Sequence, residues 1–326
     1  MGLFLAIDGG GSHTRCLAID ADGIIRGSGS GGPSNHLLVD QEVVRESLKT
    51  SVLEALNSSG VSSGEILGVA AGLAGVDYDG SGAEEMRPIF DNLGFERTVI
   101  EGDMVIAHAG ALAGTPGIIA LAGTGSSVLG IRDDGTRVKI GGWGPIFGDE
   151  GSAYRIGQAA LRASARDFDG RGPETRLTAA VLEVLALSEF SEAVEAVYLD
   201  EMQPRDIAAL SETVYSVAKQ GDPVAEQILG TAGKELAECV TAAVHRLKIA
   251  DRKIRVSYQG SVMVACEPVR ISFCAHLSRE ASQVEIIPPR FLPVIGAYLL
   301  VQSSAGAIID EALLTVLDEA NNKGWT

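Results

Sequence analysis

Two glycine-rich turns that carry hydroxyl side chains are the first candidates for chemistry in this sequence. Each turn follows an apolar run, 3–7 or 117–122. Because glycine has no Cβ, backbone N–H groups in such turns can approach phosphate oxygens closely, and Ser or Thr hydroxyls add donors. Neither turn has the Gly-Lys-Ser/Thr ending of a Walker loop, and neither leads directly into a helix as a dinucleotide fingerprint does. One turn alone favours an ordinary hairpin, but two equivalent turns predict phosphate binding by Gly10, Gly11, Ser12, Thr124 and Gly125.

Asp8 stands at the base of the first turn, at the end of an apolar strand. Its carboxylate is therefore expected to face a ligand. Mg²⁺ held by one or two carboxylates together with substrate phosphates suits this position. The alternative is an aspartate that stabilises the turn, which is common. The equivalent place in the second turn is Ala122, so the pattern predicts a single metal-side carboxylate.

Asp103 ends one predicted strand and begins a helix. Ligands bind at the carboxyl ends of strands in open α/β sheets. A sugar hydroxyl that attacks a γ-phosphate must lose its proton, and a positioned carboxylate can accept it. A helix N-cap explains the same residue equally well, and the sequence leaves both roles open for Asp103.

Asp149 and Glu150 precede a helix, where acidic residues favour the helix dipole. The run 141–152 around them holds five glycines together with Trp143 and Phe147, which a bare helix cap does not require. A carboxylate beside an aromatic ring in a glycine-rich loop suits recognition of sugar diols and apolar sugar faces. Asn35, in a second loop, can donate to and accept from the same hydroxyls.

The elements that must position these residues occur as two copies of one pattern. Each copy reads strand, glycine turn, strand, Asp-Gly hairpin, strand, and the hairpins are Asp22-Gly23 and Asp134-Gly135. Alternation and apolar periodicity predict strands at 3–8, 15–20, 24–28, 66–71, 97–101, 117–122, 127–132, 136–140, 253–259 and 285–287. They predict helices at 41–57 (with Asp40 as N-cap), 84–93, 104–112, 153–166, 269–278, 293–304 and 307–321, with 173–248 almost entirely helical.

This order predicts an α/β protein of two domains, each with a mixed sheet flanked by helices, and a cleft between them. We assign residues 1–116 to the first domain and 117–306 to the second, with a helical insertion over about 153–248. The last helix, about 307–326, could complete either domain, and we consider its addition to the first domain as an option. The length of 326 residues agrees with two domains.

Charge and composition exclude several function classes. A net charge of −17 disfavours a nucleic-acid partner, whose phosphates need a basic face. No apolar run approaches the roughly 20 residues of a membrane span, and the first residues lack a basic signal-peptide region, so we expect no membrane association. The four cysteines show no CxxC spacing and indicate buried thiols in a reducing compartment, so a cytoplasmic location is expected.

Several of these motifs together resemble the N-acetylglucosamine kinase branch of the BadF/BadG/BcrA/BcrD ATPase family. That family belongs to the actin, hexokinase and Hsp70-like superfamily, whose two domains share an RNase H-like core. The resemblance covers the chain from Leu3 to about Gln158 and continues more loosely through Gly260-Ser261. The motifs that carry it are Asp8-Gly9-Gly10-Gly11-Ser12, Gly32-Pro33-Ser34-Asn35-His36, Gly123-Thr124-Gly125-Ser126 and the run from Gly141-Gly142-Trp143-Gly144 to Gly148-Asp149-Glu150-Gly151-Ser152-Ala153-Tyr154.

The resemblance implies a role for each matching residue. Asp103 matches the catalytic base, Asp8 the metal-side acid, and Ser12 and Thr124 the phosphate-loop hydroxyls. Gly260 and Ser261 match the loop that holds adenosine. The sugar-contacting positions are Asn35, Asp103, Ser126, Ser127, Gly142, Trp143, Gly144 and Asp149. Two departures, Met104 after the base and Pro145-Ile146-Phe147 beside the sugar pocket, bear on which sugar is accepted.

The expected activity is therefore an ATP- and Mg²⁺-dependent kinase that phosphorylates the 6-hydroxyl of N-acetylglucosamine or a close amino sugar. Glucosamine and N-acetylmuramic acid are alternative acceptors, and the family suggests a homodimer. An ATPase that activates a dehydratase or reductase through an iron–sulfur cluster is an alternative of another class, which the scattered cysteines disfavour. A sugar sensor without catalysis is a third option, disfavoured because Asp8, Asp103 and Asp149 are all present.

Overall fold

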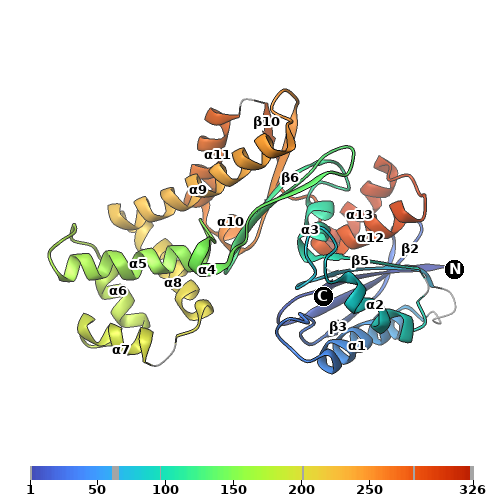
Figure 1. Cartoon of the computed structure of the whole chain (residues 1–326), viewed down its shortest axis with the longest axis horizontal. Coiled ribbons are helices and arrows are strands. Elements are labelled where there is room, and N and C mark those ends of the chain that lie inside the picture. The colour runs from blue at the N-terminus through green and yellow to red at the C-terminus, as the bar shows by residue number, and fades with distance from the viewer. Residues whose placement is uncertain (1, 61–65, 96, 200–201, 282, 324–326) are drawn as a thin grey trace. The chain divides into compact units, whose positions relative to one another are not determined.

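The computed structural model describes residues 2–60, 66–95, 97–199, 202–281 and 283–323, and the chain forms two compact units (Figure 1). Unit 1 comprises residues 1–117, 132–137 and 288–326, and unit 2 comprises 118–131 and 138–287. Residues 324–326 of the predicted last helix lie outside the described residues.

Unit 1 contains a mixed sheet of five strands, as predicted. The order is β3-β2-β1-β4-β5, with β1 antiparallel to β2 and parallel to β4. Alternate residues of β1 enter two cores: Leu5 packs towards α1 (Gln41–Ser59) and α2 (Ala83–Asn92), and Ala6 packs towards α3 (Asp103–Ala111), α12 (Pro293–Ser304) and α13 (Glu311–Lys323). The strands are β1 (Leu3–Gly9), β2 (Thr14–Asp20), β3 (Ile25–Gly31), β4 (Ile66–Leu73) and β5 (Thr98–Gly102).

Helix α1 (Gln41–Ser59) lies on β3 at unusually short range because one face of that strand is made of glycine. A Cβ on Gly29 would lie 2.1 Å from the Ser51 carbonyl oxygen, and Gly27 and Gly31 meet α1 in the same way. Asp40 occupies the predicted N-cap position, but its side chain makes no capping hydrogen bond.

Helices α2 (Ala83–Asn92), α3 (Asp103–Ala111), α12 (Pro293–Ser304) and α13 (Glu311–Lys323) complete unit 1. Here α12 crosses α3 closely, since a Cβ on Gly296 would lie 1.9 Å from the Ile106 carbonyl oxygen. The sequence analysis assigned 288–306 to the second domain, whereas the structure places these residues in unit 1. The apolar faces of α12 cover β1 and β4, and this packing decides the unit to which it belongs.

Unit 2 repeats the strand order of unit 1. Its sheet runs β10-β9-β6-β7-β8, so β6, β7, β8, β9 and β10 occupy the places of β1, β2, β3, β4 and β5. Strand β9 is parallel to β6 and β10. Tight turns join β6 to β7 and β7 to β8, which makes these neighbours antiparallel. The strands are β6 (Gly117–Ala122), β7 (Ser126–Ile131), β8 (Arg137–Gly141), β9 (Ile254–Gln259) and β10 (Val284–Ile286).

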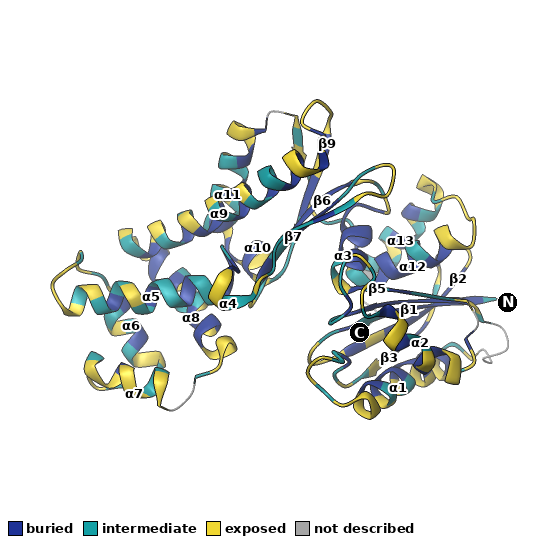
Figure 2. Cartoon of the chain, in the orientation of Figure 1, coloured by how far each residue is buried: buried dark blue, intermediate teal, exposed yellow. Residues whose placement is uncertain are grey.

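The helical insertion lies between β8 and β9, a connection whose counterpart in unit 1 holds α1 as its one helix among the described residues. Its helices pack on the sheet and on one another through a large apolar core, whereas α7 is mostly exposed (Figure 2). The helices of this unit are α4 (Gly144–Phe147), α5 (Ala153–Phe168), α6 (Leu177–Val184), α7 (Ala193–Tyr198), α8 (Pro204–Ala218), α9 (Pro223–Leu247), α10 (Ser261–Ala265) and α11 (Glu267–Glu280), with a 3₁₀ turn at Phe190–Glu192. Among the described helices, none combines the length and the apolar character needed to cross a lipid bilayer.

Candidate functional site

Asp8 and Asp103 lie at the same edge of the unit 1 sheet. The ladders place Gly9, Leu73 and Gly102 in one row across β1, β4 and β5. Asp8 is one residue before that row on β1, and Asp103 is one residue after it on the first turn of α3. Both carboxylates therefore stand at the carboxyl ends of parallel strands, where α/β sheets bind ligands.

The two carboxylates interact electrostatically. Burial, together with the charge of Asp103, raises the pKa of Asp8 to about 6, and Arg15 acts in the opposite direction. Arg15 is the register partner of Asp8 on β2, so its guanidinium is on the same face of the sheet. Asp103 itself is exposed, and one of its oxygens accepts the Met104 N–H at 2.8 Å. This edge can hold a cation or take up a proton.

The first glycine turn has N–H and hydroxyl groups that make no hydrogen bond within the described residues. The N–H of Gly10 donates to the His13 carbonyl at 2.9 Å. Within the described chain, the N–H groups of Gly11 and Ser12 and the exposed Ser12 hydroxyl have no acceptor. A Cβ on Gly11 would meet nothing closer than 3.9 Å. Such a turn can receive an anionic group.

Asn35 lies in a loop that is fastened to the first turn. The Ser34 N–H donates to the Gly10 carbonyl at 3.0 Å, and the Thr14 hydroxyl donates to Ser34 Oγ at 2.9 Å. Asn35 Oδ1 accepts the Leu37 N–H at 3.0 Å. Within the described residues its side-chain NH₂ has no acceptor, so two donors remain for a ligand.

In unit 2 the second glycine turn is fixed to the start of α5. The carbonyls of Gly123 and Thr124 accept the N–H groups of Ala153 and Tyr154, at 2.9 and 3.2 Å. These N–H groups have no partner inside the helix, so the turn caps α5 together with Ser152, whose Oγ accepts from the Arg155 N–H. The carbonyl oxygens of the turn thus face the helix.

Some of the N–H and hydroxyl groups of this turn are available to a ligand. Among the described residues, the N–H groups of Thr124 and Gly125 and the exposed Thr124 hydroxyl find no acceptor. Beside the turn, a Cβ on Gly260 would lie 2.3 Å from the Ala122 carbonyl, and Gly260 has φ +96. Only glycine allows this approach, which sets Ser261, the first residue of α10, next to the turn.

Asp149 is a buried carboxylate beside the second glycine turn, in unit 2. It is 7 % exposed and has φ 61, a left-handed conformation that is uncommon outside glycine. Burial raises its pKa, while a long contact of 3.5 Å with the Ser126 N–H acts in the opposite direction. A Cβ on Gly125 would lie 3.0 Å from Asp149 Oδ2, so the glycine makes room for the carboxylate.

The remaining predicted sugar contacts differ in their exposure. The Ser126 hydroxyl donates to the Glu150 carbonyl at 2.7 Å, so its proton is used inside the protein. Ser127 lies beside Gly142, which has φ 69, and Gly144 has φ 82. Trp143 is 75 % exposed on unit 2.

The structure thus groups the predicted site residues into two sets. Asp8, Gly10, Gly11, Ser12, Asn35 and Asp103 lie in unit 1, and the other predicted residues, from Thr124 to Ser261, lie in unit 2. The sequence analysis missed Arg15 and Thr14. Period-two alternation places Arg15 on the face of Asp8 once the β1–β2 register is known, whereas the bond from Thr14 to Ser34 spans 20 residues and has no local signal.

Known proteins of similar sequence point to one family. The model of the BadF/BadG/BcrA/BcrD ATPase family matches residues 5–301. An N-acetylmuramic acid/N-acetylglucosamine kinase of Clostridium acetobutylicum is 32 % identical over 301 residues, which cover 92 % of this chain and 98 % of that protein. An N-acetyl-D-glucosamine kinase of Dictyostelium discoideum is 26 % identical over 313 residues, covering 93 % and 98 %.

Solved structures agree with this assignment. A Chromobacterium violaceum protein, provisionally assigned as an N-acetylglucosamine kinase, superposes with a TM-score of 0.72 at 26 % identity, covering 93 % of this chain and 99 % of that one. A ROK family glucokinase of Streptomyces griseus, at 16 % identity and a TM-score of 0.52, shares the fold over 99 % and 100 % of the chains. The match over nearly the whole length, together with two sheets of one topology, shows that this chain belongs to the BadF/BadG/BcrA/BcrD ATPase family.

Proposed function

We propose that this protein is an ATP-dependent kinase that transfers the γ-phosphoryl group to the 6-hydroxyl of N-acetylglucosamine or a close amino sugar. Family membership and the amino sugar kinases among its relatives support the reaction class. The observation that carries the proposal is the pairing of Asp8 and Asp103 at one edge of the first sheet.

In this proposal Asp103 is the general base. It is exposed at the start of α3, so its carboxylate can reach the acceptor hydroxyl and take its proton as the phosphoryl group moves. Asn35 offers an amide to the sugar hydroxyls from the neighbouring loop. In unit 2 we assign Ser126, Ser127, Gly142, Trp143, Gly144 and Asp149 to the sugar.

The phosphates of ATP are assigned to the two glycine turns. Ser12 and Thr124 supply free hydroxyls, and Gly10, Gly11 and Gly125 supply backbone that a phosphate can approach. Gly260 and Ser261 are assigned to the nucleoside. A small cavity of about 80 Å³ opens beside Ser261 and is lined by Tyr215, Val262 and Cys266.

The carboxylate oxygens of Asp8 are suitable ligands for Mg²⁺. A largely buried carboxylate, whose pKa is raised by burial and by a second carboxylate, gains from a hard cation close by. When bound, Mg²⁺ would offset the negative charge of the transferring phosphates. Asp8 would hold it on the protein side, and Arg15 would keep the remaining negative charge of this edge low.

The role of Asp103 is tested by the Asp103→Asn variant. Turnover should fall by at least about a hundredfold, because general bases typically contribute 10²–10⁴-fold, while sugar binding measured by calorimetry persists. Asp91→Asn, which changes an exposed carboxylate on α2, is the matched control and should keep full activity. Near-normal turnover of Asp103→Asn would remove the base assignment.

The acceptor is tested with a panel of sugars in a coupled assay for ADP. N-acetylglucosamine should give the highest kcat/KM, and glucosamine and N-acetylmuramic acid are the competing acceptors. Uniformly low rates with every amino sugar would overturn the proposed substrate class. Iron and colour in the purified protein would instead support an activator of a dehydratase or reductase, although burial raises the pKa of all four thiols.

We further propose that the enzyme is a cytoplasmic homodimer. The relatives are enzymes of small-molecule metabolism, and the four cysteines of this chain are free. Light scattering coupled to size-exclusion chromatography tests the dimer, and a mass of one chain at micromolar concentration would contradict it.

A further inference from the structure

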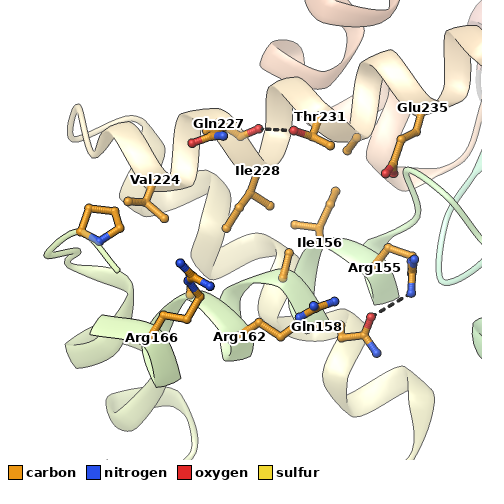
Figure 3. A pocket seen from close by; sticks show the side chains of 14 residues that line it. Arg155, Ile156, Gln158, Arg162, Arg166, Val224, Gln227, Ile228, Thr231 and Glu235 are labelled. Atoms are coloured by element: carbon orange, nitrogen blue, oxygen red, sulfur yellow. Dashed lines mark hydrogen bonds between the residues drawn. The ribbon is translucent and has the colours of Figure 1, made fainter. Parts of the chain in front are cut away.

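A cavity of about 460 Å³ lies between α5 and α9 of unit 2, away from the predicted site residues (Figure 3). Arginine side chains rise from α5 on one side, and α9 contributes Ile228, Thr231 and Glu235 on the other. The small cavity beside Ser261 is lined mainly by α8 and α10, and Ile156 of α5 lines both cavities. The volume of the larger cavity is in the range of small-molecule pockets.

The charge of this cavity is unusual for so acidic a chain. Arg155, Arg162 and Arg166 all line it, and in the described part of the chain none has a carboxylate oxygen within 4 Å. Arg155 donates to Gln158 Oε1 at 2.9 Å, and Arg166 donates to the Arg171 carbonyl at 3.1 Å. By contrast, Arg26, Arg137 and Arg290 are each paired with an acid, as expected in a chain of net charge −17.

These three guanidinium groups raise the positive potential of one cavity, and the carboxylates of Glu235 and Asp149 are near enough to Arg155 to act on it electrostatically. Guanidinium groups bind phosphate and carboxylate oxygens through paired N–H donors. Ile156 of α5 and Ile228 of α9 offer apolar walls that suit a carbon skeleton, whereas the Thr231 hydroxyl already donates to the Gln227 carbonyl at 2.9 Å. We propose that the α5–α9 cavity binds a small metabolite with a phosphate or carboxylate head group.

The cavity is connected to the loop that carries Asp149. Glu235 lines the cavity and also accepts the Gly151 N–H at 3.2 Å. Arg155 belongs to the first turn of α5, directly after that loop. A bound anion attracts Arg155 and repels Glu235, so its binding changes the hydrogen bond that holds Gly151. The binding proposal does not depend on sugar phosphorylation, because it rests on the cavity alone.

Titration calorimetry tests the cavity with three probes: inorganic phosphate, glycerate and 3-phosphoglycerate. Saturating Mg²⁺ and ADP are present to occupy the proposed nucleotide phosphate site. We expect 3-phosphoglycerate to bind the wild-type protein with a Kd below about 1 mM. The order of the other two probes identifies the preferred head group.

Variants that remove positive charge and a variant that removes negative charge make the test specific, because they should change the affinity in opposite directions. The double variant Arg162→Ala/Arg166→Ala should bind at least about tenfold more weakly, because two charge-assisted contacts are lost. Glu235→Gln keeps an acceptor for Gly151 but removes the negative charge, so it should bind more tightly. Arg246→Ala, an exposed arginine of α9 outside the cavity, is the matched control. Thermal melts of all variants check folding.

Three results overturn the proposal: no heat from any probe with the wild-type protein, equal affinity in the double arginine variant, or weaker binding in Glu235→Gln. The connection to the loop has its own readout. Hydrogen exchange at the Gly151 amide should change when 3-phosphoglycerate binds. Unchanged exchange would contradict the coupling to the loop but would not contradict the binding site.

Discussion

Arg137 forms a two-fold ion pair with Glu101, the last residue but one of β5 (Nη1–Oε2 2.7 Å and Nη2–Oε1 2.8 Å). Arg137 Nη1 also donates to the Tyr78 carbonyl at 2.7 Å. Both side chains are mostly buried, so the pair is shielded from solvent. This pair fixes the strand end from which Asp103 follows after only one further residue.

Removing the guanidinium should therefore destabilise unit 1. We expect Arg137→Ala to lower the free energy of unfolding by about 2–4 kcal/mol, since partners of charge-assisted hydrogen bonds are left unpaired. Urea denaturation measures the change. The control is Arg132→Ala in the same hairpin, whose partner Asp134 is exposed, and its effect on the free energy of unfolding should be clearly smaller. Equal effects of the two variants would contradict the structural role of the pair.

The carboxylates at the proposed catalytic edge should titrate as neighbours. The charge of Asp103 raises the pKa of Asp8, which is about 6. In Asp103→Asn this repulsion is absent, so the pKa of Asp8 should fall towards, without reaching, its ordinary value, because burial still acts. Carbon-detected NMR of the side-chain carboxyl groups measures it. An unchanged or higher pKa would mean that the two groups do not interact.

His108 makes the stability depend on pH. It is buried in α3 and bonded through Nε2 to the Gly117 carbonyl at 3.0 Å, and burial lowers its pKa to about 4. The unfolded chain, with an ordinary pKa of 6.5, binds the proton more readily. This contribution is complete above pH 6.5 and is lost as the pH falls from 6.5 to 4, by about 3 kcal/mol in total.

The variant His108→Gln tests this dependence, because glutamine can still donate to Gly117 but does not titrate. Its free energy of unfolding should change less between pH 6.5 and 4 than that of the wild-type protein. His245→Gln, an exposed histidine at the end of α9, should retain the wild-type slope. Parallel pH profiles for all three proteins would rule out the role of His108.

The glycine face of β3 should tolerate no side chain. In Gly29→Ala the new methyl group would stand 2.1 Å from the Ser51 carbonyl, so α1 must move away from the sheet. We expect a loss of about 1–3 kcal/mol, the usual cost of overpacking, in a thermal or urea melt. Ser28→Ala, on the opposite face of β3, is the control with a small effect. A Gly29→Ala protein as stable as this control would show that α1 does not pack as described.

The elements could be predicted closely where local signals are strong. Strand 117–122 and helix 293–304 have the predicted bounds, because Gly117 and Pro293 mark their starts. Helices α4 and α10 were missed because helices of four or five residues are too short for a period of 3.6 to appear. The placement of α12 in unit 1 was also missed, since periodicity identifies an apolar face but not the sheet that covers it.

Part of the candidate site was likewise within reach of the sequence. Asp8, Asp103 and the glycine turns follow from strand ends and turn composition. The hydrogen bonds that hold these residues in place could not be predicted in this way, because the Thr14–Ser34 bond and the carbonyls that cap α5 join residues far apart in the chain. The cavity between α5 and α9 was not predicted either, because its arginines look like ordinary surface charges until α9 lies opposite them.

The capping of α5 by the turn at Gly123 and Thr124 joins the helix and the turn into one rigid element. The helix has 16 residues and is about 24 Å long, so it connects the turn to residues far from it. Because the turn holds the helix through its carbonyls, its open N–H groups travel with the helix axis. Helix and turn are therefore expected to move together, so a displacement of α5 should also shift the N–H groups that we assign to a phosphate.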